Sequence, residues 1–130
     1  MQGKTPKINL SGDAYNPLFE EIIVHHTATP CDKKYNVNWC RALHKGKGWH
    51  DIGYHLYIEA DGSISRGRPI HKRGAHCKGR NSISFGIAFV GGLKDGEPKN
   101  TITPKQKAAL TECIAELRNI TGKPLPVFSH

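Results

Sequence analysis

One long helix near the C-terminal end of the sequence constrains the fold most, because most other apolar runs have the length of strands. Thr103 can cap this helix, Pro104 fits its first position, and Gln106 can complete a capping box. Gly122 favours its termination. A helix of this kind packs against its neighbours through a single apolar face. The residues expected on that face are Leu110, Cys113, Ile114, Leu117 and Ile120.

Short apolar runs elsewhere predict strands separated by loops that contain glycine and proline. The run EEIIVH predicts a buried strand, ISFGIAFVGG predicts a central strand, and LPVFSH predicts a final strand. The segment GYHLYIEADGSISRGR predicts a hairpin, because alternating residues lead into Asp61-Gly62, a pair that tolerates the positive φ of a tight turn. The segment NVNWCRALHKGKGW predicts a second, shorter helix.

The order of these elements is β, α, β, β, β, α, β. It predicts an α/β fold in which helices flank a central mixed β-sheet. A chain of 130 residues suits one domain with one core. The first residues are polar and contain Pro6, Gly12 and Pro17. We therefore expect an N-terminal arm over residues 1–20 and a single folded domain over residues 21–130.

Charge and hydropathy narrow the classes of partner. The formal net charge of +8 predicts attraction to a polyanion, whether nucleic acid, an acidic membrane surface or an anionic cell-wall polymer. No stretch approaches the roughly 18–20 apolar residues of a membrane span, and the N-terminus lacks the apolar segment of a signal peptide. We expect a protein that is cytoplasmic when made and does not insert into a membrane.

The four cysteines are Cys31, Cys40, Cys77 and Cys113, and no two of them form a CxxC pair. We therefore do not expect a zinc ribbon or a thioredoxin-type redox motif. Cys113 falls on the apolar face of the long helix, where we expect it to be buried. A disulfide between Cys31 and Cys40 is possible in an oxidising compartment, and both alternatives stay open.

Histidine is frequent, with eight residues in the chain. His25 and His130 each follow an apolar run that we interpret as a strand, and strand ends of α/β sheets are where ligands collect. Neutral imidazole is the commonest metal ligand, and a catalytic zinc usually has three protein ligands. For a single histidine the alternative is an exposed or hydrogen-bonded structural side chain.

Four segments share the order and spacing of one known family: IIVHHTATP, GWHDIGYHLYIEADGSISRGRP, GAHCKGRNSISFGIAFVGG and TPKQ. In these segments the chain resembles the type 2 N-acetylmuramoyl-L-alanine amidases, which include the T7-type phage lysozymes and the animal peptidoglycan recognition proteins. The resemblance runs from about Glu21 to His130 and is greatest to the phage and bacterial branch. It implies that residues 21–130 form an amidase-like domain with the fold of that family.

The resemblance also implies which residues form the site. The family's first two zinc ligands match His25 and His130, and its catalytic tyrosine matches Tyr54. His26 should point away from the metal, because successive residues of a strand face opposite ways. By the same alternation, we expect His55 to lie in the core or to contact the site residues without binding the metal. The residues that match the family's substrate-binding loop are His76, Lys78, Arg80 and Asn81.

One family feature has no counterpart in the sequence. The family's third zinc ligand is a cysteine or an aspartate about eight residues after the second histidine, together with a lysine or threonine that assists catalysis. The sequence ends at His130, and none of its four cysteines matches that position. We therefore expect the amidase-like domain to be truncated at its C-terminus. We also expect the 130 residues alone to bind zinc weakly and to hydrolyse little.

The function implied by the resemblance is Zn²⁺-dependent hydrolysis of the amide between the lactyl group of N-acetylmuramic acid and L-alanine. The enzyme would be a monomer that acts on peptidoglycan of the cell wall after release or lysis, as an endolysin does. The alternative is a non-catalytic module that binds peptidoglycan, which the absent third ligand favours. A nucleic-acid binder is a weaker alternative, because the sequence has no recognisable RNA-binding or helix-turn-helix motif.

Overall fold

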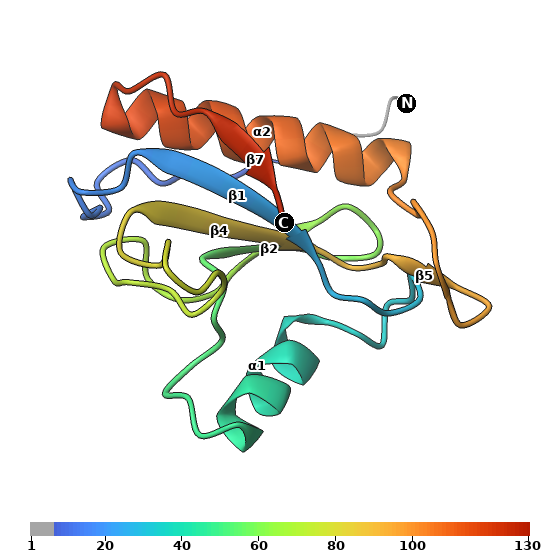
Figure 1. The fold of residues 1–130 in the computed structure, drawn as a ribbon. Coiled ribbons are helices and arrows are strands. Elements are labelled where there is room, and N and C mark those ends of the chain that lie inside the picture. The colour runs from blue at the N-terminus through green and yellow to red at the C-terminus, as the bar shows by residue number, and fades with distance from the viewer. Residues whose placement is uncertain (1–6) are drawn as a thin grey trace.

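The computed structural model describes residues 7–130, and the first six residues of the expected N-terminal arm lie outside the described part. Seven strands and two helices follow one another along this part of the chain (Figure 1). In order they are β1 (Glu21–His26), α1 (Val37–Gly46), β2 (Leu56–Ile58), β3 (Ile64–Arg66), β4 (Ser84–Phe89), β5 (Leu93–Lys94), β6 (Glu97–Pro98), α2 (Pro104–Thr121) and β7 (Val127–Ser129).

Five of the strands form one sheet in the order β3-β2-β4-β1-β7. β4 lies at the centre and runs parallel to both β1 and β2, and β7 is added parallel to the outer side of β1. Only β3 is antiparallel, because it forms a hairpin with β2 across Asp61 and Gly62. The predicted α/β fold with a mixed sheet is confirmed.

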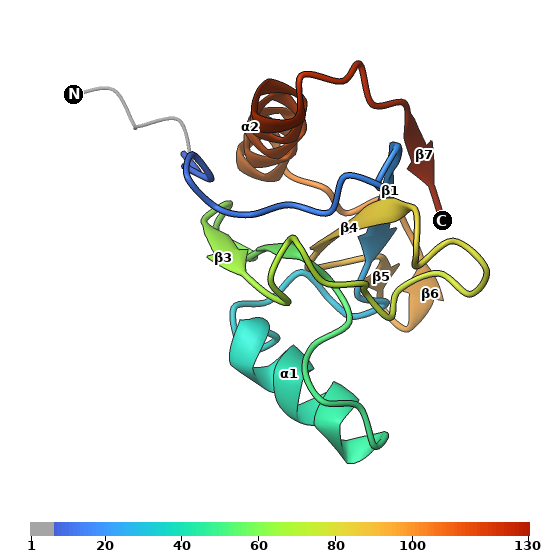
Figure 2. The ribbon, with the colours of Figure 1, turned by 90° about the vertical axis from the view of Figure 1, so that its left-hand side faces the viewer.

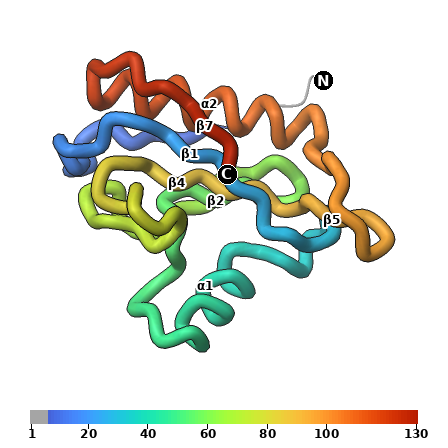
Figure 3. The backbone as a smooth tube through the Cα atoms, in the orientation of Figure 1, coloured from blue at the N-terminus to red at the C-terminus, as the bar shows by residue number. Residues whose placement is uncertain are grey.

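The two helices lie on opposite faces of the sheet (Figures 1 and 2). α2 covers one face, where Ala109, Cys113 and Leu117 join the main core. α1 lies against the other face, and its Cys40 packs in a smaller cluster with Ile52, Tyr57, Ala88 and Val90. The backbone trace shows that the carboxyl end of β7 comes close to that of β1 (Figure 3). The strands of the main core contribute Ile22, Leu56, Ile58, Phe85 and Ile87.

The start of α2 follows the sequence prediction closely. The Thr103 hydroxyl accepts a hydrogen bond from the Gln106 backbone N–H at 3.1 Å, and the Gln106 side-chain oxygen accepts from the Thr103 N–H at 3.0 Å. Gln106 is also buried, and its amide nitrogen donates to the Val90 carbonyl at 2.8 Å. The capping box therefore also ties the helix to the end of β4. Gly122 ends the helix in the left-handed conformation, with φ of 68°.

Three features add to the predictions. Residues 7–20 form no helix or strand, but Leu10 is fully buried in the main core and its N–H bonds the Glu116 carboxylate at 2.6 Å. β5 and β6 form a small hairpin that the sequence did not predict. All four cysteines are free thiols, so Cys31 and Cys40 form no disulfide.

Neither helix in residues 7–130 is apolar enough over a sufficient length to cross a bilayer.

Candidate active site

β1 presents His25 to the face of the sheet opposite α2. Ile22 and Val24 pack in the main core beneath α2, so the alternation of the strand turns His25 the other way. His25 is only 5% exposed. His26 is exposed instead, and its Nδ1 accepts a hydrogen bond from the Ala28 N–H at 3.1 Å. The two adjacent histidines therefore lie in different environments, as the alternation predicted.

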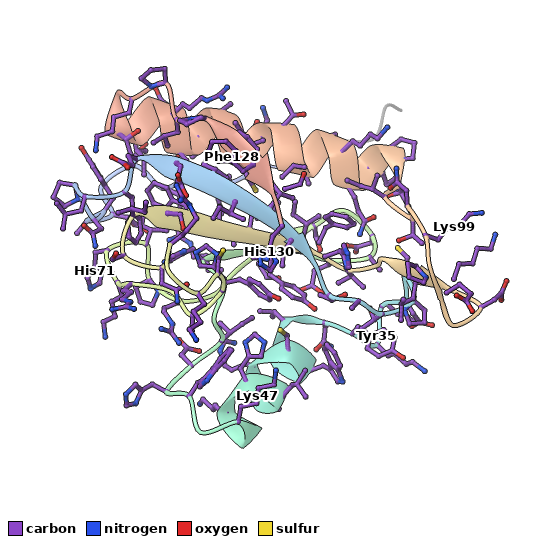
Figure 4. All side chains as sticks on the ribbon, in the orientation of Figure 1. Tyr35, Lys47, His71, Lys99, Phe128 and His130 are labelled. Carbon is purple, nitrogen blue, oxygen red and sulfur yellow. The ribbon has the colours of Figure 1, made fainter. Side chains whose placement is uncertain are left out.

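His130 reaches the same place from the end of β7. Its backbone N–H donates to the Val24 carbonyl at 3.0 Å, which continues the parallel pairing of β7 with β1. The centroids of the His25 and His130 rings are consequently 4.8 Å apart. Figure 4 shows His130 at the tip of β7, in front of the carboxyl end of β1. Two segments from opposite ends of the domain thus meet at the carboxyl edge of the sheet.

Tyr54 lies beside His25 just before β2, with 5.3 Å between the ring centroids. The ring also packs in the smaller cluster beneath α1. Burial raises the pKa of the Tyr54 phenol to about 12. The hydroxyl therefore stays protonated near neutral pH and is available as a hydrogen-bond donor.

His76 contacts His25 directly. Its Nδ1 lies 2.8 Å from His25 Nε2, and its Nε2 faces Ser84 on β4. Burial, followed by the nearby His76 and His130, lowers the pKa of His25 to about 3. Burial also lowers the pKa of His76. Both imidazoles are therefore neutral near pH 7, the state in which imidazole binds a metal.

The other three residues expected in the substrate loop differ in whether their side chains bond to other groups of the protein. The Asn81 side-chain oxygen accepts from the backbone N–H groups of His76 and Cys77, at 2.8 and 2.9 Å, and so shapes the loop. Arg80 forms an ion pair with Glu21, whose side chain is almost fully buried. Lys78 is exposed to solvent. Asn81 and Arg80 thus have internal partners, while Lys78 extends outward.

Two hollows lie beside this group of histidines, one lined by His76 and the other by His130. One has a volume of about 420 Å³, and the other, beside His130, has a volume of about 360 Å³. Cys77 lines both of them. The first is lined by Trp49, Arg73, Ala75, His76, Cys77, Lys78, Gly79 and Asn81. The second is lined by Ile23, Cys77, Arg80, Phe128, Ser129 and His130.

Trp49 and Arg73 also line the larger of these two hollows, which the sequence did not predict. Trp49 packs against the His44 ring, with 4.6 Å between the ring centroids. It nevertheless also forms a wall of the larger hollow. An aromatic and a basic residue in glycine-containing loops were the available signal, but their approach to His76 depends on how those loops fold.

His25 and His130 fit part of a metal site. His25 Nδ1 has no hydrogen-bond partner in the described chain, and every fully buried side-chain nitrogen or oxygen there has one, so Nδ1 is open to solvent. A neutral imidazole nitrogen of this kind is a suitable zinc ligand. Within residues 7–130, however, no group of three or more His, Cys, Asp or Glu side chains is arranged to hold a metal ion. The described residues therefore offer two ligands.

Known proteins with similar sequences belong to the family that the sequence resembles. Residues 15–130 match a family model described as N-acetylmuramoyl-L-alanine amidase. The chain is 38% identical over 111 residues to the endolysin of Enterobacteria phage K11, which covers 85% of this chain and 74% of that protein. It spans 66% of the length of three other phage endolysins that it matches.

Two solved structures show the same architecture. N-acetylmuramoyl-L-alanine amidase LysC from Clostridium intestinale is 31% identical with a TM-score of 0.71, and the match covers 98% of this chain and 83% of that one. Bumblebee PGRP-SA is 25% identical with a TM-score of 0.75, over 99% of this chain and 77% of that one.

Proposed function

Because the chain belongs to the N-acetylmuramoyl-L-alanine amidase family, we propose that it hydrolyses the amide between the lactyl group of N-acetylmuramic acid and L-alanine in peptidoglycan. The observation that carries this proposal is the convergence of His25, His130 and Tyr54 on the face of the sheet opposite α2. A hollow of about 420 Å³ is lined by His76, whose ring contacts His25. This arrangement offers metal ligands, a hydrogen-bond donor and room for a substrate within one region.

In this proposal His25 and His130 would hold a zinc ion through their imidazole nitrogens. When bound there, zinc would act as a Lewis acid for the amide carbonyl and would lower the pKa of a water molecule to near neutral. Its third protein ligand is not among residues 7–130 as they are arranged here. The two histidines alone would therefore hold the ion more weakly than a complete set of three ligands.

The role of Tyr54 in this proposal is to stabilise the oxyanion that develops when the amide carbonyl is attacked. A phenol with a pKa of about 12 keeps its proton and donates a hydrogen bond. The Tyr54 ring lies beside that of His25, with 5.3 Å between the centroids, so the phenol is close to the proposed metal ligand. A positioned donor of this type typically contributes 10²–10³-fold to kcat.

The groove residues suit a muropeptide. Trp49 offers an aromatic surface for a sugar or peptide, and Arg73 and Lys78 offer cationic donors for carboxylates. Asn81 keeps its amide nitrogen as a donor while its oxygen shapes the loop. The net charge of +8 favours approach to an anionic cell wall. We further propose that the protein works as a monomer, reaching the wall after release or lysis.

The second candidate function is peptidoglycan binding without cleavage. It is favoured by the absence of a three-ligand group in residues 7–130 and by the similarity to PGRP-SA. The two functions differ in their products. An amidase releases peptides that begin with L-alanine from purified sacculi, whereas a binding module is retained on sacculi and releases none.

The experiment compares the native protein with Tyr54→Phe, in the presence of added zinc. We expect Tyr54→Phe to lose at least 10²-fold in peptide release while keeping its affinity for sacculi. Tyr57→Phe is the matched control, because Tyr57 is fully buried and its hydroxyl donates to the Tyr35 carbonyl at 2.6 Å instead. Equal rates of peptide release by the native protein and Tyr54→Phe would show that the Tyr54 hydroxyl takes no part in the reaction.

A further inference from the structure

We propose that His76 is a positioning residue that holds His25 in the tautomer with hydrogen on Nε2, so that His25 presents Nδ1 to the metal. The inference deepens the proposed function, since it takes His25 as a metal ligand. It also gives His76 a role other than contact with substrate. A chain of hydrogen bonds leads from Ser84 on β4 through His76 to His25 on β1.

The first link is between Ser84 and His76. The Ser84 hydroxyl donates its hydrogen to the Arg80 carbonyl at 2.7 Å, so toward His76 its oxygen acts only as an acceptor. The Ser84 backbone carbonyl is an acceptor in any case. His76 Nε2 lies 3.2 Å from the hydroxyl oxygen and 3.3 Å from the carbonyl oxygen. Nε2 of His76 must therefore carry the hydrogen.

The second link is between His76 and His25. A neutral imidazole that carries its hydrogen on Nε2 has a lone pair on Nδ1. Because His76 Nδ1 lies 2.8 Å from His25 Nε2, His25 Nε2 must donate. His25 Nδ1 then holds the free lone pair, and it is the ring nitrogen that has no partner in the described residues. Metal-binding histidines usually donate their second ring nitrogen in this way.

The His76 ring is held in place by close packing. A Cβ atom added to Gly86 would lie 2.6 Å from His76 Cγ, and one added to Gly74 would lie 2.7 Å from His76 Cδ2. Both glycines therefore make room for the ring. At the backbone, Asn81 accepts the His76 N–H at 2.8 Å. The ring is thus fixed from two sides and at its base, as a group that orients a ligand must be.

Two substitutions separate this role from simple packing. His76→Ala removes the acceptor for His25 Nε2. His76→Asn places an amide oxygen near the position of Nδ1 and keeps an acceptor there. Long-range ¹H–¹⁵N NMR of the metal-free protein near neutral pH reports the tautomer of each histidine ring. We expect His25 to be the Nε2–H tautomer in the native protein and in His76→Asn, and to become a mixture in His76→Ala.

Metal affinity gives a second measurement. Loss of an orienting partner typically weakens metal binding 10–100-fold. We therefore expect zinc to bind His76→Ala about 10–100-fold more weakly than the native protein, and His76→Asn to recover most of the difference. Competition with a chromophoric chelator measures this without any assay of hydrolysis.

An Nδ1–H tautomer of His25 in the native protein would overturn the inference, even if His76→Ala failed to fold. Unchanged tautomer and affinity in a folded His76→Ala would overturn it as well. A protein that shows the expected tautomer but releases no peptides from sacculi would contradict only the proposed function. The two proposals can therefore fail separately.

Discussion

The rings of His25 and His130 lie with their centroids 4.8 Å apart because β7 pairs in parallel with β1. Among the strands of residues 7–130, β1 is the only one that pairs with β7, whose three residues are all exposed. The last bond of the pairing, from the His130 N–H to the Val24 carbonyl, fixes the backbone of one ligand to the strand that carries the other. The candidate metal site therefore depends on the edge of the sheet rather than on the core.

The two adjacent histidines of β1 should separate cleanly in their effect on zinc. His25→Ala removes a buried ligand and is expected to abolish zinc binding, whereas His26→Ala removes an exposed ring and should leave it within about twofold, as is usual for surface changes. Isothermal titration with zinc on both purified variants makes the comparison. Equal loss in both would contradict the assignment of faces.

Zinc should exchange readily from residues 7–130. Only two ligands converge there, so we expect less than one equivalent of zinc to survive gel filtration in metal-free buffer. Elemental analysis before and after filtration measures the loss. Retention of a full equivalent would mean that a third side chain of the described residues rearranges to bind the ion.

The buried face of α2 should be intolerant of charge. Leu117→Asp places a carboxylate among the main core residues and is expected to cost several kcal/mol. Asn119→Asp introduces the same charge on the exposed side of the helix and is the matched control. Denaturant unfolding of both variants tests this, and similar midpoints would show that α2 does not pack through Leu117.

Stability should fall as the pH falls from 6.5 toward 4. Burial lowers the pKa of His44 and of His55 to about 4, whereas an unfolded histidine titrates near 6.5. Within this window the unfolded chain binds more protons than the folded one, so stability rises with pH and levels off above it. One pKa unit corresponds to about 1.4 kcal/mol, so each buried histidine accounts for a few kcal/mol.

His44→Asn tests the contribution of one of these groups. His44 Nδ1 accepts from the Gly53 N–H at 2.9 Å, and an asparagine oxygen can take over that bond without titrating. We expect the melting temperature of His44→Asn to depend less steeply on pH between 5 and 6.5 than that of the native protein. Parallel curves would contradict the assignment of a buried neutral His44.

The larger elements of the fold were predictable because their signals are local. The capping box of Thr103 and Gln106 and the spacing of Leu117 with its neighbours define α2 without reference to the rest of the chain. The β5–β6 hairpin was missed because strands of two residues show no alternation. Leu10 was missed because a single apolar residue in a polar segment carries no periodic signal, and its burial depends on α2.

The candidate site was predictable in part. His25 and His130 follow strands, and the family resemblance identified them together with Tyr54. The contact of His76 with His25 was not predictable, because it requires the loop shape set by Asn81 and the space left by Gly86. The pairing of Arg80 with Glu21 was likewise hidden, since it joins a loop to the first residue of β1.

The most direct test of the central claim is mass spectrometry of the products released from purified sacculi, with zinc in excess to occupy the site. We predict peptides with a free L-alanine amino terminus, glycan strands that keep their lactyl groups, and no such products from His25→Ala. No release by the native protein at saturating zinc would contradict the account, as would new reducing sugar ends in place of L-alanine termini, or equal release by His25→Ala.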